Sequence, residues 1–345
     1  MKIEAKFRLL SAARLVDGLG GPVRERAAVL LEDNNITQIG TEETVSVPEG
    51  VPVEKIDFGE RTILPGLVDC HVHLIGIGDG RSGEELATLP DEILTLQAAH
   101  NARSHLFSGV TTVRDCGSKN QTAFLLRRAV DMGITSAPRL ILAGRPLTLS
   151  GGHLSYFGAR PTGLVECQAA VRQLLKEGAD FVKIVATGGR TKTSSTQPPS
   201  FGVAELKTIC DEIHNFGKHA VARCTSSQSM DNVLEAGIDT ITHGIHKEPD
   251  GSTRYRPEIS ERIAEQGVFV NPAMYALRIR VEELEIKQDQ EGLIATEQTK
   301  LDELRAEHEV RLDHFRRMRE AGVTMVCGSD SGWGHYRMGN FQGEL

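Results

Sequence analysis

Short apolar segments alternate with longer amphipathic stretches along most of the chain, and this alternation defines the predicted elements. Most of the apolar segments follow a helical stretch that ends in glycine, the residue that favours a helix C-terminus. We expect strands at 62–68 (running on toward residue 73), 110–115, 139–144, 181–185, 219–223, 240–243, 268–270 and 323–327. Strands that alternate with helices in this number are typical of a (β/α)₈ TIM barrel. In that fold the active site lies at the carboxyl ends of the strands.

The region before the barrel has a different pattern. Brief apolar segments at 27–32 and 36–39 are separated by the turn cluster Asp33-Asn34-Asn35, and no helical periodicity intervenes. We therefore expect two domains, a small all-β domain over residues 1–61 and the barrel over 62–345.

A long charged helical stretch, residues 280–319, interrupts the rhythm between the seventh and eighth strands. Charged stretches of this kind usually face water, so we expect a solvated helical hairpin. A lid over the site or an assembly element is the alternative.

Composition excludes several classes of protein. The chain has 345 residues, 39% of them hydrophobic, and a formal net charge of −8, so it carries no electrostatic footprint for nucleic acid. It lacks an apolar run of about 18 residues, the length that would indicate a membrane helix. The N-terminus has no signal-peptide core, so we expect a cytoplasmic protein. The six cysteines are spread singly, which argues against a disulfide framework or a structural zinc knuckle.

Residues with metal-binding or proton-transfer chemistry stand at the ends of four predicted strands. They are His71 and His73 on the first strand, Lys183 on the fourth, His243 on the sixth and Asp330 after the eighth. Side chains alternate along a strand, so His71 and His73 point the same way. Neutral imidazoles suit zinc and similar ions. A lysine in an apolar strand loses its charge readily, and its neutral amine can react with CO₂ to give a carbamate ligand.

These segments resemble the amidohydrolase superfamily, and within it the group of imidazolonepropionase and the prolidase-like hydrolases. The matching stretches are 64–73, 109–115, 182–184, 236–244 and 328–330. The resemblance implies that residues 1–61 belong to a β-sandwich. It implies that His71, His73 and Asp330 bind one metal, and that carbamylated Lys183 bridges to a second metal held with His243. Zinc is the expected ion, with Co²⁺, Fe²⁺ and Mn²⁺ as alternatives.

The activity implied is hydrolysis of a C–N bond in a small-molecule amide, urea or carbamate by a metal-activated water. Asp330 would shuttle the proton, and His243 or the metal would polarise the carbonyl. His153, which follows Gly151-Gly152, and Arg190, which follows Gly188-Gly189, are candidates for substrate binding.

The fifth strand departs from the family pattern. The family supplies a histidine ligand there, but this chain reads Val221-Ala222-Arg223-Cys224. Arginine stays protonated and cannot bind a metal, whereas Cys224 could bind one if the strand were shifted by one residue. A mononuclear site and a binuclear site with an unusual ligand both remain open. Phenylurea and molinate hydrolases also resemble the chain in an altered ligand here, which favours ureas, anilides or thiocarbamates.

Three further expectations concern the chain as a whole. The family continues beyond the eighth strand, so we expect the chain to be truncated at its C-terminus. A catalytically impaired relative that serves in assembly is the alternative to an enzyme, and a homo-oligomer is expected in either case.

Overall fold

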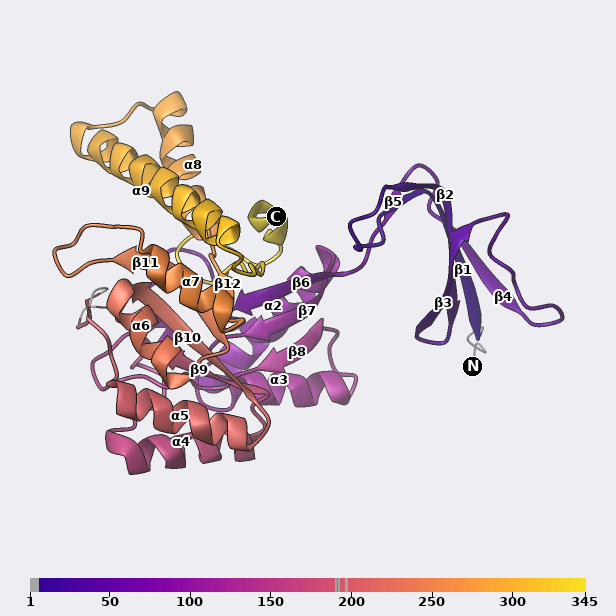
Figure 1. Cartoon of the computed structure of the whole chain (residues 1–345). Helices are drawn as coiled ribbons and strands as arrows, with labels where there is room; N and C mark the ends of the chain where they lie inside the picture. The colour runs from indigo at the N-terminus through magenta and orange to yellow at the C-terminus, as the bar shows by residue number, and fades with distance from the viewer. Residues whose placement is uncertain (1–5, 190, 192, 196–197) are drawn as a thin grey trace. The chain divides into compact units, whose positions relative to one another are not determined.

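The computed structural model describes residues 6–189, 191, 193–195 and 198–345. The chain divides into two compact units, Met1–Gly66 and Leu67–Leu345 (Figure 1). The boundary follows Pro65-Gly66, which interrupts the apolar run from Thr62 onward. Proline lacks the N–H that a strand interior needs. The run therefore supplies a strand to each unit, whereas the sequence predicted one strand and a boundary after residue 61.

The first unit is one five-stranded sheet rather than two packed layers. Its order is β3-β2-β1-β4, with β5 pairing to β1. The strands are β1 (Phe7–Leu15), β2 (Arg24–Glu32), β3 (Asn35–Thr41), β4 (Val53–Asp57) and β5 (Thr62–Ile63). Leu15, Ala27 and Val29 form its small core.

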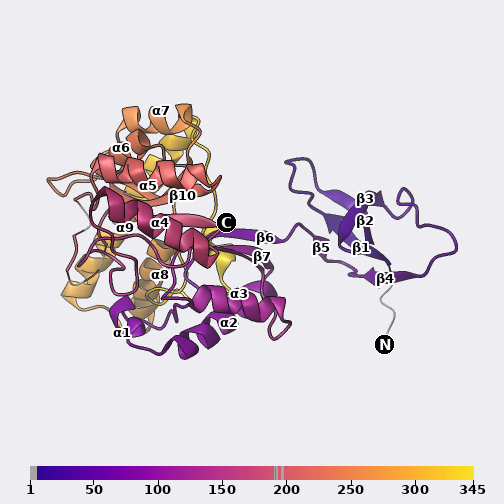
Figure 2. The same ribbon diagram turned by 90° about the horizontal axis from the view of Figure 1, so that it is seen from below.

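The second unit is a barrel of parallel strands with helices on its outside, which confirms the predicted fold class (Figures 1 and 2). One sheet has the order β6-β7-β8 and the other β12-β11-β10-β9. The loop after β8 joins them, because Leu147 N–H donates to the Lys183 carbonyl over 2.8 Å. The strands are β6 (Leu67–Val72), β7 (Val110–Asp115), β8 (Arg139–Leu142), β9 (Phe181–Val185), β10 (His219–Ser226), β11 (Thr240–Lys247) and β12 (Phe269–Asn271).

The predicted eighth strand, 323–327, closes the barrel without becoming a regular strand. Met325 forms a single parallel bridge to β12, and the residues that follow hydrogen-bond to β6. Asn271 Nδ2 donates to the carbonyls of Val326 and Gly328, over 3.2 and 3.0 Å. The side-chain amide of Asn271 thus donates to backbone carbonyls that would accept from backbone N–H groups if this segment formed a continuous parallel strand.

Helices cover the strands and bury an aliphatic core between the two layers. The prediction that helices end at glycine is confirmed for α4 and α6. They end at Gly178 and Gly237 in the left-handed conformation, with φ of 105° and 85°. The helices are α1 (Gly83–Ala87), α2 (Asp91–Phe107), α3 (Thr122–Asp131), α4 (Gly163–Glu177), α5 (Val203–Asn215), α6 (Ser227–Ala236), α7 (Pro257–Glu265), α8 (Tyr275–Gln290), α9 (Ala295–Glu320) and the 3₁₀ turn η1 (Phe341–Glu344).

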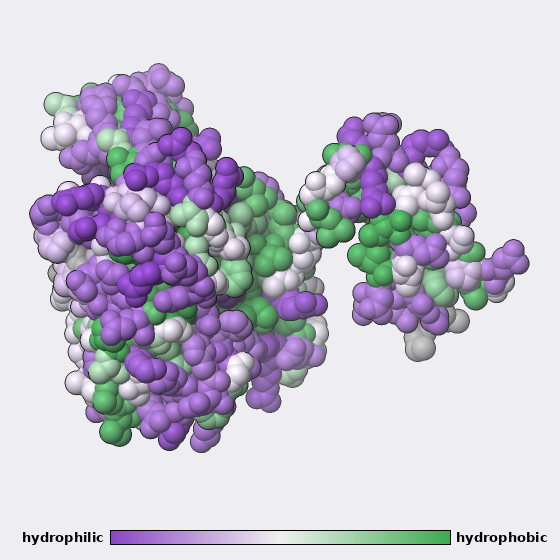
Figure 3. All heavy atoms as spheres, in the orientation of Figure 1, coloured by the Kyte–Doolittle hydropathy of each residue, from purple (hydrophilic) through white to green (hydrophobic). Residues whose placement is uncertain are grey.

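Helices α8 and α9 form the hairpin that the charged stretch predicts, and its visible surface is mainly hydrophilic (Figure 3). Across the described residues, none of the helices has the length and hydropathy needed to cross a bilayer.

Candidate metal centre

His71, His73 and Asp330 come together at the carboxyl end of the barrel. His71 lies in β6, His73 follows its end, and one ligand atom from each of the three residues lies within 4.8 Å of the others. Asp330 Oδ1 is 3.3 Å from His71 Nε2 and 3.4 Å from His73 Nε2. The two histidines are only 1% and 3% exposed. Two imidazoles and a carboxylate are a donor set that suits a divalent ion.

Hydrogen bonds on the far side of each imidazole leave its Nε2 lone pair for a metal. His73 Nδ1 lies 3.0 Å from the Gly117 carbonyl, which can only accept, so Nδ1 carries the proton. His71 Nδ1 lies 2.9 Å from Asn271 Oδ1. The Asn271 amide is oriented by the bonds from its Nδ2 described above, so its oxygen faces His71 and accepts as well. Partners of this kind fix the tautomer of metal-binding histidines.

Close packing holds these groups in place. A Cβ at Gly328 would lie 2.8 Å from both the backbone nitrogen and the Cβ of His71. Only glycine therefore lets the segment before Asp330 pass beside the histidine strand.

Replacing Asn271 with alanine should weaken the binding of a divalent metal by roughly 10- to 100-fold, because His71 loses the acceptor that sets its tautomer. Competition with a chelator, with Zn²⁺ as the probe ion, measures the change. Replacing Asn215 with alanine should leave the affinity unchanged, because Asn215 is exposed at the end of α5. Equal affinities for the two variants would contradict the role given to Asn271.

Burial determines most of the protonation states. It lowers the pKa of His71 well below its usual value, with the charge of Lys183 as the next cause. Burial alone would raise the pKa of Asp330, but the neighbouring imidazoles, His71 first, hold it well below the usual range. Burial also lowers the pKa of Lys183 to about 8. At neutral pH the site therefore offers the neutral imidazole of His71 and the ionised carboxylate of Asp330.

Lys183 and His243 lie in the same cavity as the three-residue group. Lys183 Nζ donates to Thr242 Oγ1 over 2.8 Å. His243 Nε2 is 3.9 Å from Asp330 Oδ2, and its ring packs edge-on against His71 with centroids 5.5 Å apart.

The fifth strand directs Arg223 and Cys224 in opposite directions. Arg223 lines the cavity, and its Nη1 contacts His243 Nε2. Cys224 is buried in the hydrophobic core, where its Sγ lies 3.9 Å from the Ser229 carbonyl. Burial raises the pKa of the Cys224 thiol to about 12, so it stays protonated. The shifted strand that would make Cys224 a ligand is absent from the described β10, and Cys224 is not a metal ligand.

Of the two predicted substrate-binding residues, His153 lies in the cavity and Arg190 falls outside the described residues. The His153 ring packs closely on Gly189. A Cβ added at residue 189 would lie only 2.5 Å from Cγ of His153. Burial, followed by the charge of Arg223, lowers the pKa of His153 well below its usual value. Its Nδ1 is buried and has no hydrogen-bond partner among the described residues.

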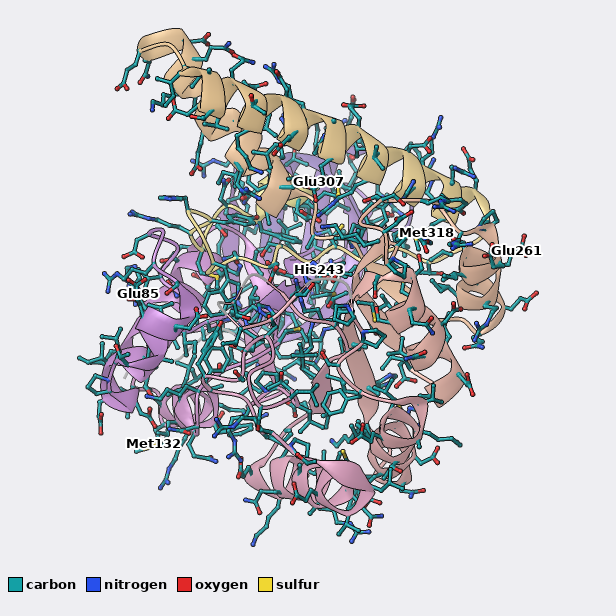
Figure 4. The ribbon with its side chains drawn as sticks, turned by 90° about the vertical axis from the view of Figure 1, so that its left-hand side faces the viewer. Glu85, Met132, His243, Glu261, Glu307 and Met318 are labelled. Carbon is teal, nitrogen blue, oxygen red and sulfur yellow. The ribbon has the colours of Figure 1, made fainter. Side chains whose placement is uncertain are left out.

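The cavity has a volume of about 630 Å³, which is typical of a small-molecule site. Its wall includes Arg280 of α8 and both Lys300 and Arg311 of α9. Figure 4 shows Glu307 of α9, another wall residue, on the side of the hairpin that faces His243. The hairpin therefore covers the site, and the expectation that it is merely solvated is wrong. The alternative, a lid over the site, fits the face of the hairpin that lines the cavity.

Backbone strain is concentrated around this cavity. Among the described residues other than glycine, seven have positive φ, and four of these line the cavity. They are Leu154 (61°), His243 (69°), Ala273 (51°) and Asp330 (56°). Such conformations persist where the surrounding structure fixes them, and they are common at functional sites.

Sequence reasoning missed two residues that belong to this site. Asn271 follows the predicted strand 268–270, and a polar residue at a strand end was the available signal. Trp333 lines the cavity and packs on His73 with ring centroids 5.0 Å apart. No pattern in the sequence distinguishes this tryptophan.

The model of the amidohydrolase family matches residues 62–345. The chain belongs to the amidohydrolase family, as the motifs indicated.

The chain is also similar to characterised relatives and to solved structures. Ochratoxinase of Aspergillus niger is 25% identical over 363 residues, which covers 95% of this chain and 70% of ochratoxinase. The structure of a Xaa-Pro dipeptidase with methionine bound in its active site has a TM-score of 0.78 and 26% identity, covering 98% of this chain and 82% of that one. Molinate hydrolase has a TM-score of 0.72 at 22% identity, covering 95% and 73%. This last likeness concerns the fold alone.

Proposed function

We propose that the chain is a metal-dependent hydrolase that cleaves a C–N bond in a small-molecule substrate. The observation that carries the proposal is the His71/His73/Asp330 group, with both Nε2 atoms facing the carboxylate at the base of a covered cavity. Membership of the amidohydrolase family supports it.

Zinc is the proposed ion, with Co²⁺, Fe²⁺ and Mn²⁺ as alternatives. A divalent ion bound there supplies a Lewis acid that lowers the pKa of a water molecule and polarises a carbonyl group. Asp330 takes the proton of the attacking water and passes it to the departing nitrogen. His153, which lines the cavity, is the proposed contact with the substrate.

A carbamate on Lys183 is part of the proposal. The amine must lose its proton before it reacts with CO₂, and the pKa of about 8 brings the neutral form within reach at neutral pH. The buried position of Lys183, 2% exposed, protects a carbamate from bulk water.

The charge of the cavity supports an anionic substrate. Although the whole chain has a net charge of −8, the described residues that line the cavity include six basic side chains besides Lys183, against two acidic ones and the negative charge that a carbamate on Lys183 would add. The acidic ones are Asp330 and Glu307, and the six basic ones are Arg81, Arg223, Lys247, Arg280, Lys300 and Arg311. Because the Xaa-Pro dipeptidase relative binds methionine, an amino acid with a carboxylate, we favour amides of amino acids over neutral ureas, anilides and thiocarbamates.

A matched pair of amides tests the proposal. The protein is stripped with a chelator, reloaded with each of the four ions, and assayed on N-benzoylglycine and on N-benzoylglycinamide. We expect turnover only after reloading, with kcat/KM roughly tenfold higher for the carboxylate, the effect of about one ion pair.

Both halves of the proposal can fail separately in this assay. The absence of metal-dependent turnover on both amides, and on a urea and a carbamate assayed beside them, would favour the non-catalytic alternative. Faster turnover of the neutral amide would overturn the anionic substrate while leaving the hydrolase in place.

A further inference from the structure

Arg223 lies at the position where the family pattern has a histidine ligand, and its guanidinium reaches the metal centre. β10 pairs with β11 so that Arg223 lies opposite Thr242, one residue before His243. From there Arg223 Nη1 contacts His243 Nε2. The contact places a permanent positive charge beside the imidazole that the family pattern assigns to a second metal.

This contact is incompatible with a second metal on His243. A guanidinium has five N–H donors and no acceptor, and it stays protonated. His243 Nε2 must therefore accept from Arg223, which takes the lone pair that a metal would need. A second divalent ion would also be repelled by the guanidinium at close range. The remaining candidate on this strand, Cys224, is a protonated thiol in the core.

The donor set of the first metal is not affected by this contact. His71 and His73 keep their Nε2 atoms directed at Asp330 through bonds to Asn271 and Gly117. The residues thus fit one ion and do not fit two.

We propose that Arg223 replaces the second metal, so that the centre holds one ion and the guanidinium supplies the second positive charge. The single-ion part rests on the metal site of the proposed function, and the catalytic part rests on its hydrolytic reaction. In that reaction the water oxygen bonds to the carbonyl carbon, and the C=O π electron pair moves to the carbonyl oxygen. Arg223 donates hydrogen bonds to this oxyanion.

The reaction is completed without any further reagent. The oxyanion pair re-forms C=O, the C–N bond breaks with its electron pair going to nitrogen, and this nitrogen takes the proton that Asp330 removed from water. The products are a carboxylic acid and an amine. Preorganised donors at a developing oxyanion are among the largest single contributions to catalysis.

Metal stoichiometry tests the single-ion part without any substrate. Wild-type protein, Arg223→His and Arg223→Ala are stripped, equilibrated with excess Zn²⁺, freed of unbound ion and analysed by plasma mass spectrometry. We expect one zinc per chain for the wild type and for Arg223→Ala, and two for Arg223→His, which restores the family ligand. Two zinc ions on the wild type would overturn the inference, and so would one on a folded Arg223→His.

Kinetics test the catalytic part. Arg223→Ala should lower kcat by about 10²- to 10³-fold at one bound zinc, and Arg223→Lys, which keeps a charge and donors, should recover part of the loss. Arg278→Ala is the matched control, because Arg278 lies on the exposed side of α8 and pairs with Glu282. An unchanged kcat in Arg223→Ala would overturn the catalytic part.

Failure of the proposed function looks different from failure of this inference. Wild-type protein that binds no zinc, or turns over no substrate at any zinc content, contradicts the hydrolase itself. If Arg223→His fails to fold, the wild-type stoichiometry and the kinetics of Arg223→Ala still decide the inference.

Discussion

Asparagine at Asp330 is expected to lower kcat by about 10²- to 10⁴-fold, the usual contribution of a general acid–base group. The carboxylate lies against His71 and His73, and its low pKa keeps it ionised at neutral pH. It can therefore both bind a metal and take a proton. The asparagine amide has the same shape but no charge, so it is a weaker metal ligand. It also cannot take a proton at this pH.

Asparagine is the appropriate replacement because of the backbone. Asp330 has a φ of 56°, a region that asparagine tolerates much better than alanine. Loss of activity in Asp330→Asn can therefore be attributed to the carboxylate rather than to a displaced loop. Steady-state kinetics at saturating zinc separate the proton-transfer defect from weaker metal binding, which plasma mass spectrometry measures.

Asp131→Asn provides the control, since Asp131 is exposed at the end of α3. Its kcat and its zinc content should match the wild type. If Asp330→Asn, loaded with zinc, kept the wild-type kcat, Asp330 would not be the proton shuttle.

The barrel and the metal-binding group could be predicted because both depend on local rules. Parallel strands place their carboxyl ends at one edge, so His71, His73 and Asp330 could be brought together without knowing any packing detail. The glycines that precede the predicted strands indicated helix C-termini for the same reason. Gly178, which ends α4 in the left-handed conformation, is an example. What the pattern could not reveal was that Pro65-Gly66 divides one apolar run between two units.

Other features depend on tertiary contacts that no periodicity encodes. The hairpin of α8 and α9 has a charged sequence whether its inner face meets water or the cavity, so composition favoured the wrong alternative. Likewise, the sequence indicated only that a histidine ligand is replaced at Arg223. The β10–β11 register and the contact from Arg223 Nη1 to His243 Nε2 show that the guanidinium donates to this imidazole. Asn271 replaces part of the eighth strand's ladder through its side chain, which strand propensity cannot predict.

Alanine at Asp69 is expected to lower the free energy of unfolding by about 3–5 kcal/mol, the cost of breaking a buried charged network. Its carboxylate accepts from His71 N–H at 3.1 Å and from Ser329 N–H at 2.9 Å. It also accepts from Ser329 Oγ at 2.6 Å and from His105 Nε2 at 3.1 Å. Asp69, His105 and Ser329 are fully buried, so alanine would leave three N–H donors, those of His71, Ser329 and the His105 ring, without this acceptor or a water molecule, whereas Ser329 Oγ still has Ser331 Oγ at 2.9 Å.

This network joins three parts of the barrel below the metal centre. The Gly339 N–H donates to His105 Nδ1 over 2.8 Å, so the proton of the neutral ring is on Nε2 and points at Asp69. The carboxylate thereby ties β6 to α2 and to the segment that closes the barrel, one residue before Asp330. Urea unfolding followed by circular dichroism measures the loss.

Asp211→Asn is the matched control for Asp69→Ala. Asp211 forms an exposed ion pair with Lys207 at 2.9 Å, with side chains 56% and 59% exposed, and such pairs contribute less than about 1 kcal/mol. Its urea midpoint should therefore stay near that of the wild type, whereas that of Asp69→Ala falls sharply. Asp69→Asn, which keeps one acceptor oxygen, should lie between the two. Similar midpoints for Asp69→Ala and Asp211→Asn would mean that the barrel closes without this carboxylate, and that backbone pairing of β6 with its neighbours suffices to hold His71 in place.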